Sequence, residues 1–217
     1  MKPACRSSES VAMRLQAYGA LVHGLPDWVH ASWCQRAGLS QAPRRPESYA
    51  SLSVALGVGI PAAVSFESIA HRVAVLAPAL LSRVLRARAL LRRRAALRHC
   101  LDEALRRRLM AWLHPAVFTA VLTESLDGPH HAFDGLPLPL NLGLHDGVDM
   151  LAWEGFCLFQ NDGVWTDPAL LRLLRLAFPA DQPLPAGLAA SSGAANGSTW
   201  VLDRLDRFVP EVSWLCG

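Results

Sequence analysis

Long apolar runs and the residue pattern of a signal peptide are both missing from this sequence of 217 residues. The least polar run, residues 52–64, is shorter than the roughly 20 apolar residues that a membrane-spanning helix needs, and Gly57, Gly59 and Pro61 interrupt it. We therefore expect this run to lie in a protein core. The N-terminus lacks the basic-then-apolar pattern of a signal peptide, so we expect a cytoplasmic protein.

Paired cysteines are missing as well. The five cysteines are odd in number and no two of them form a C-x-x-C motif. This pattern favours reduced thiols over a disulfide framework, and it disfavours a zinc cluster. The cysteines are Cys5, Cys34, Cys100, Cys157 and Cys216.

No catalytic motif is present. The sequence has no G-x-S-x-G, and the glycines at 57 and 59 lack both the third glycine of a dinucleotide fingerprint and the lysine of a P-loop. One group combines imidazoles with carboxylates without the H-x-x-x-H or H-E-x-x-H spacing of a metal site. We expect this group to consist of ordinary polar residues that hold no metal. We also expect a protein with no cofactor and no enzymatic activity. A helical enzyme that uses this group is the third-ranked alternative. The group is His130, His131, His145, Asp146 and Asp149.

The composition predicts a folded, mainly helical chain. Hydrophobic residues make up 52% and charged residues 18%, which excludes an entirely disordered chain. The length fits one domain, so we predict a single helical domain over residues 1–217, an irregular all-α bundle. Residues 186–199 have the composition of a flexible linker before a C-terminal tail over residues 200–217, and the dense Gly and Pro content of residues 126–147 predicts a long loop.

Start and stop signals divide the chain into helices. Apolar residues at spacings of three and four predict a helix that ends near Gly24, followed by a short helix around residues 28–36. Asp102 is a predicted N-cap, and Pro115 is predicted in the first turn of the next helix. Asp167 and Pro168 predict the start of the clearest helix. A short amphipathic helix is expected within residues 200–210.

Arginine is concentrated in one stretch, residues 83–109, which holds ten of the twenty arginines and only two carboxylates. The rest of the chain is therefore net acidic, so the positive field is local. A nucleic-acid surface is one interpretation, but the stretch has no Asn or Gln to read base edges and no aromatic platform for stacking. A solvated exterior of core helices and a docking face for an acidic protein partner are the other two.

Three segments together resemble a known family. Residues 87–122, "ARALLRRRAALRHCLDEALRRRLMAWLHPAVFTAVL", resemble the central signature of the SctK family (the YscK and PscK group with its Hrp counterparts), accessory proteins of type III secretion. The segments "LHDGVDMLAWEGFCLF" and "DPALLRLLRLAFPADQPLP" are similar to its C-terminal half. The N-terminal "LPDWVHASW" resembles the opening of the Hrp branch.

The resemblance implies a function in secretion. It implies an all-helical, non-enzymatic adaptor of the cytoplasmic sorting platform, linking the cytoplasmic domain of the inner-membrane ring protein SctD to the platform protein SctQ, which with SctL connects to the ATPase SctN. A basic helical nucleic-acid-binding regulator is the second hypothesis. Under the adaptor hypothesis we expect electrostatic docking and apolar anchoring by arginines and tryptophans, namely Arg92, Arg93, Arg106, Arg107, Trp28 and Trp33.

Overall fold

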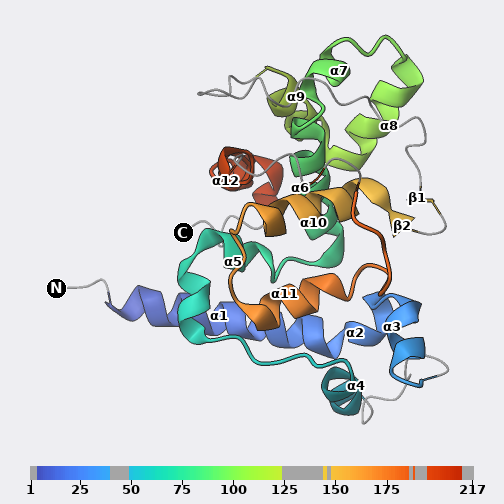
Figure 1. The fold of residues 1–217 in the computed structure, drawn as a ribbon. Coiled ribbons are helices and arrows are strands. Elements are labelled where there is room, and N and C mark those ends of the chain that lie inside the picture. The colour runs from blue at the N-terminus through green and yellow to red at the C-terminus, as the bar shows by residue number, and fades with distance from the viewer. Residues whose placement is uncertain are drawn as a thin grey trace. The chain divides into compact units, whose positions relative to one another are not determined.

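A computed structural model describes residues 4–39, 49–123, 144–145, 148–185, 188 and 195–211 (Figure 1). Over these residues the regular elements are helices, apart from one antiparallel pair of two-residue strands, Leu144–His145 (β1) and Val148–Asp149 (β2). The predicted all-α fold is confirmed. None of the described helices is long and apolar enough to cross a membrane.

The chain forms two compact units. The first contains Met1–Pro78 and Trp165–Pro183, and the second contains Ala79–Val164 and Leu184–Gly217. The chain therefore passes from one unit to the other three times, so neither unit is a continuous piece of the sequence. The single domain over residues 1–217 stays a prediction.

The first unit consists of short helices around one long helix. Its elements are α1 (Ala4–His23), α2 (Leu25–Trp28), α3 (Ala31–Arg36), α4 (Tyr49–Ala55), the 3-10 helix η2 (Ala63–Glu67), α5 (Ile69–Val73) and α11 (Pro168–Arg175). Leu25, Phe66 and Leu170 are fully buried in it. These side chains come from three distant parts of the sequence. Their burial in one unit holds α11 beside the N-terminal helices.

Local signals account for most helix ends in the first unit. Helix α1 ends at His23, as predicted, and Asp167 caps α11 by accepting hydrogen bonds from the backbone N–H groups of Ala169 and Leu170. The helix predicted over residues 28–36 is instead α2 followed by α3, because the backbone is extended at Val29 and His30.

The apolar run at residues 52–64 is only partly core. Leu52 and Leu56 are buried, as expected, but Val54, Ile60 and Val64 are exposed. The run includes the end of α4, the turn at Gly57 with φ of 66° and the start of η2, so its side chains cannot all face one way.

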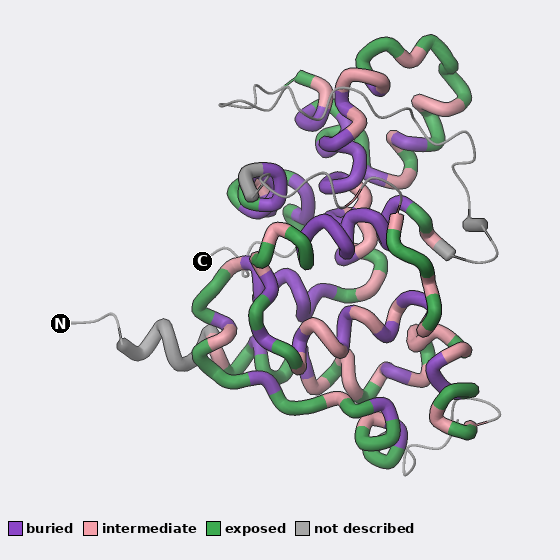
Figure 2. Tube along the Cα trace, in the orientation of Figure 1, coloured by how far each residue is buried: buried purple, intermediate pink, exposed green. Residues whose placement is uncertain are grey.

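The second unit contains the arginine-rich helices. Its elements are α6 (Pro78–Leu91), α7 (Arg94–Arg98), α8 (Glu103–Leu113), α9 (Pro115–Thr123), β1, β2, α10 (Met150–Asn161), α12 (Ala195–Leu202) and α13 (Leu205–Phe208). Helix α10 is buried along almost its whole length, residues 151–159, as Figure 2 shows. At Gly155 a Cβ atom would lie 1.9 Å from the Leu85 carbonyl oxygen, so the lack of a side chain lets α10 cross directly against α6.

The predicted division of the arginine-rich stretch is confirmed and extended. Asp102 is the N-cap of α8, accepting a hydrogen bond from the Leu105 N–H at 3.0 Å, and Pro115 begins α9. A further break at Arg92 and Arg93 separates α6 from α7. The sequence contains no proline or glycine at this break, which is why it escaped prediction.

The C-terminal tail begins earlier than predicted. The last five residues of the predicted linker, 195–199, belong to α12, and Ser198 within them is fully buried. Apart from Leu188, the rest of residues 186–199 lies outside the described residues, as does most of the predicted loop at residues 126–147. The helix predicted within residues 200–210 is the end of α12 followed by α13.

Candidate functional site

The arginines of residues 83–109 range from a buried set to exposed residues. On α6 and α7 and at the break between them, Arg88, Arg92 and Arg94 are buried. On α8, Arg107 and Arg108 are exposed. A guanidinium loses several kcal/mol of hydration free energy on burial, and only acceptors inside the unit can offset that loss for the buried set.

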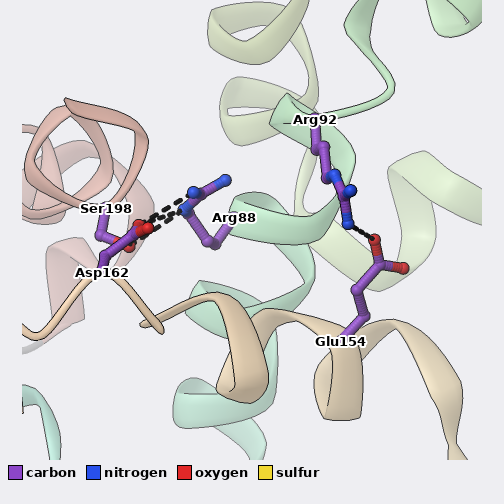
Figure 3. Close-up of polar contacts among 5 residues, drawn as sticks. All are labelled: Arg88, Arg92, Glu154, Asp162 and Ser198. Carbon is purple, nitrogen blue, oxygen red and sulfur yellow. Dashed lines mark hydrogen bonds and ion pairs between the residues drawn. The ribbon is translucent and has the colours of Figure 1, made fainter. Parts of the chain in front are cut away.

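Arg88 forms the most buried of these pairs (Figure 3). It is 1% exposed, and its Nη2 lies 2.9 Å from Asp162 Oδ2 at the end of α10. Its Nε donates to Ser198 Oγ on α12 at 3.0 Å, and the Ser198 hydroxyl in turn donates to Asp162 Oδ2 at 2.5 Å. A Cβ atom at Gly197 would lie 2.7 Å from Arg88 Cζ, so α12 packs directly on the guanidinium. This cluster joins α6, α10 and α12.

A second acidic side chain, that of Glu154, pairs with the arginines at the break between α6 and α7. Glu154 Oε1 lies 2.5 Å from Arg93 Nη1 and 3.6 Å from Arg92 Nη1. Burial lowers the pKa of Arg92 and the adjacent Glu154 carboxylate opposes that shift. One carboxylate in the middle of apolar α10 thus forms ion pairs with two arginines where the helix is interrupted.

The other arginines of α6 and α7 hold neighbouring elements. Arg86 Nε donates to Asp149 Oδ2 at 2.6 Å, while Asp149 Oδ1 caps α10 by accepting from the Ala152 N–H at 2.9 Å. Arg94 and Arg98 both donate to the carbonyl oxygen of Leu122 in the last turn of α9. These contacts are internal to the unit, so their chemistry is structural.

Helix α8 is different, because two of its three arginines, Arg107 and Arg108, are exposed. Its buried residues are Leu109 and Leu113, on the face that packs against α9. Arg107 and Arg108 form no hydrogen bond or ion pair with any residue that the structure describes. Arg106 is half-buried, with its guanidinium 6.0 Å from the ring centroid of Phe118. The outer face of α8 is therefore a free cationic surface within the described part of the chain.

The structure separates the four arginines predicted to dock a partner. Arg92 is 5% exposed and Arg93 is engaged by Glu154, which corrects the expectation that they lie on a surface. Arg106 is half-buried and Arg107 is exposed. That any of them binds a partner stays a prediction, and their exposure favours Arg107. Arg108 was not predicted, although it occupies the same exposed face.

The two predicted tryptophans lie in the first unit. Trp33 is buried, its Nε1 donates to the Phe178 carbonyl oxygen at 2.7 Å, and the Arg172 guanidinium lies 4.3 Å from its ring centroid. Trp28 is half-buried, with its Nε1 donating to the Leu21 carbonyl oxygen at 3.1 Å. Trp33 therefore stabilises the core, and only Trp28 retains a surface that a partner could contact.

The carboxylates that pair with the arginines were missed by sequence reasoning. Glu154 and Asp162 lie more than sixty residues from their partners along the chain. One signal was available for Glu154, because a single acid in the apolar run "MLAWEGFCLF" predicts a buried charge that needs a cation.

Serine, histidine and aspartate meet in the first unit, but their hydrogen bonds differ from those of a hydrolase. The Ser65 hydroxyl donates to Asp167 Oδ2, while His71 Nδ1 lies 2.8 Å from the Ser65 carbonyl oxygen and its Nε2 accepts from the Thr166 N–H. A nucleophilic triad needs the imidazole between the hydroxyl and the carboxylate. Here the imidazole binds backbone groups, so the cluster fixes the start of α11.

Metal ligands do not cluster in the described part of the chain. No group of three His, Cys, Asp or Glu side chains there could hold a metal ion. His130, His131 and Asp146 lie outside the described residues, as does the side chain of His145, and Asp149 is engaged by Arg86 and the start of α10. Burial raises the pKa of the Cys34 thiol, the opposite of what activates a nucleophile.

The chain was compared with known proteins. No curated protein and no solved structure matches it. The family model described as bacterial type III secretion protein (HrpB4) matches residues 6–211. Because this match covers nearly the whole chain, including both compact units, the resemblance to SctK proteins is confirmed, and the protein belongs to the HrpB4 family of bacterial type III secretion proteins, which is the SctK family.

Proposed function

We propose that the protein is a non-enzymatic adaptor of the type III secretion sorting platform, at the cytoplasmic face of the inner-membrane apparatus. It links the cytoplasmic domain of SctD to SctQ, and through SctQ to SctL and SctN. The observation that carries the proposal is the exposed cationic face of α8, Arg107 and Arg108, in a chain of a type III secretion family.

The internal pairing of the other arginines supports a protein partner over nucleic acid. Affinity for a phosphate backbone grows with the number of Lys and Arg contacts, and six to ten are common. Arg88 and Arg92 are buried and Arg93 is paired with Glu154, so they are not available for such contacts. Two exposed arginines on one helix suit a few carboxylates of a protein surface better.

A bridging experiment tests the adaptor function. The cytoplasmic domain of SctD is immobilised, and SctQ from the same bacterium is passed over it with and without the full-length protein. We expect SctQ to be retained only when the protein is present, and in proportion to the protein bound. Retention of SctQ without it, or binding of the protein to neither component, would contradict the bridging function.

The nucleic-acid alternative is tested on the same preparation. The full-length protein is titrated with a labelled DNA duplex at two salt concentrations. We expect only weak binding that disappears at the higher salt. Specific affinity at physiological salt, in the range of about 10 nM or tighter, would replace the adaptor hypothesis.

A further inference from the structure

An apolar side chain stands exposed beside the free arginines of α8. Leu101 is 93% exposed, which is the largest exposure of any large hydrophobic side chain in the described residues. It directly precedes Asp102, the N-cap of α8. A hydrophobic residue at this position commonly packs on the fourth residue of the helix. Here that residue is Arg106, whose guanidinium is directed to the Phe118 ring and to the Cys100 carbonyl oxygen. Leu101 is therefore left without its usual local contact.

The exposed residues of α8 form one stripe, and Leu101 precedes the helix by two residues. Ala104, Arg108 and Ala111 follow one another along α8 at spacings of four and three residues and are all exposed, with Arg107 beside them. Residues at these spacings lie on one face of a helix. The stripe extends about 10 Å along α8, close to two helical turns. The two alanines add little bulk, so another helix can approach closely on either side of the arginines.

The charge of the stripe selects the partner. Helix α8 carries three arginines and one glutamate, and Glu103 forms no ion pair with another described residue. The Asp102 carboxylate is already engaged by the Leu105 N–H. Arg107 and Arg108 thus present two forked donors to any carboxylates that face them.

We propose that Leu101 and the outer face of α8, comprising Ala104, Arg107, Arg108 and Ala111, form the docking surface for an acidic amphipathic helix of a partner protein. Leu101 inserts among apolar side chains of that helix, and the arginines pair with carboxylates one turn apart on it. The inference rests on the proposed adaptor function for the identity of the partner, SctQ or the cytoplasmic domain of SctD, but not for the chemistry of the surface.

Affinity measurements test the apolar anchor. The full-length protein is titrated by calorimetry into purified SctQ and, separately, into the purified cytoplasmic domain of SctD. We expect Leu101→Ala to weaken binding to one of these two proteins about tenfold, the loss for removing most of a buried leucine side chain. The matched control is Leu184→Ala, because Leu184 is 72% exposed and lies outside the stripe. We expect the control to change the affinity less than about twofold.

Charge reversal tests the arginines. We expect the double variant Arg107→Glu and Arg108→Glu to weaken the same binding about 100-fold. The charge-conserving variant Arg107→Lys and Arg108→Lys should lose less than about tenfold, since it keeps the attraction and loses only the forked geometry. All of these side chains are exposed, so we expect each variant to fold, and circular dichroism is used to check this.

A photo-crosslink separates the surface from the identity of its partner. The photo-reactive residue p-benzoylphenylalanine is placed at position Ala104 of the full-length protein in the native bacterium, and crosslinked peptides are identified by mass spectrometry. We expect peptides from an acidic helix. Crosslinks to an acidic helix of another protein, with no binding to SctQ or SctD, would leave the surface standing and reject the adaptor function. Wild-type affinity in the Leu101→Ala and charge-reversed variants, or crosslinks only to basic segments or nucleic acid, would overturn the docking surface.

Discussion

Removing the carboxylate of Asp162 tests whether the buried arginines are structural. The side chains of Arg88 and Asp162 are 2% and 1% exposed, so neither charge is hydrated in the fold. Asp162→Ala leaves the Arg88 guanidinium with one neutral partner, the Ser198 hydroxyl at 3.0 Å. The same hydroxyl loses the oxygen to which it donates. Removing one member of a buried pair costs about 3–5 kcal/mol, because the remaining charge stays buried and uncompensated.

A matched pair in the same unit provides the control. Arg83 Nη1 lies 3.0 Å from Glu211 Oε1, a similar distance to the one in the buried pair, but the Glu211 side chain is 50% exposed. Water and salt screen an exposed pair, so Glu211→Ala should cost less than about 1 kcal/mol. Both substitutions remove a carboxylate that lies within hydrogen-bonding distance of an arginine. The difference between their effects on the free energy of unfolding therefore measures the effect of burial.

The assay is urea denaturation followed by far-ultraviolet circular dichroism. With a denaturant dependence of about 2 kcal/mol per molar urea, a loss of about 4 kcal/mol lowers the midpoint by about 2 M. The double variant Arg88→Met and Asp162→Leu replaces the pair by apolar side chains and should recover most of that loss. If the midpoint of Asp162→Ala is no lower than that of Glu211→Ala, Arg88 is not held as the structure has it, and our division of the arginines is wrong.

Three further predictions follow from the same contacts. Gly197→Ala should cost about 1–3 kcal/mol in urea denaturation, because the added methyl group would overlap the held Arg88 guanidinium. Burial alone would raise the pKa of Asp167, but hydrogen bonds from a serine hydroxyl and backbone N–H groups outweigh it and lower the pKa below 3.8. The ionised Asp167 carboxylate therefore stabilises the fold above that value, and the stabilisation is lost as the pH falls through the folded-state pKa. The difference in free energy of unfolding between wild type and Asp167→Asn should accordingly be smaller at about pH 3 than at pH 7. Iodoacetamide mapped by mass spectrometry should label half-buried Cys100 well before Cys34, whose thiol is buried with a raised pKa, and equal rates would contradict the burial of Cys34.

Features set by adjacent residues were predictable from the sequence. Asp102 and Asp167 cap α8 and α11 because a carboxylate can reach the N–H groups two or three residues ahead of it, a relation within one turn. Pro115 begins α9 for a similarly local reason, since the missing N–H costs nothing in the first turn. The Ser65 hydroxyl, by contrast, binds Asp167 about a hundred residues away, a contact that no local pattern shows.

Features set by contacts across the sequence were not predictable. The break at Arg92 and Arg93 coincides with their pairing to Glu154, a residue some sixty positions away that no local pattern connects to them. The stretch also lacks a clean apolar stripe, so spacing alone could not show which arginines face inward. For the candidate site, the sequence showed only that the arginines are concentrated in one stretch, and the fold is needed to distinguish exposed Arg107 from buried Arg92.

The division of the arginines determines how the proposed docking surface can be tested in this protein. Reversing the charge of Arg92 would place a second carboxylate beside buried Glu154, and partner binding would then be lost through unfolding of the unit. Reversing Arg107 changes only a side chain that projects into solvent. A variant that combines both kinds of arginine therefore cannot separate docking from stability. Arg107 and Arg108 form no ion pair with a described residue and lie on one face of α8, next to an exposed leucine, so a partner needs complementary carboxylates over only about two helical turns. Binding through so short a stripe depends on the apolar contact as much as on charge, which is why Leu101 and the arginine pair should each weaken it when changed alone.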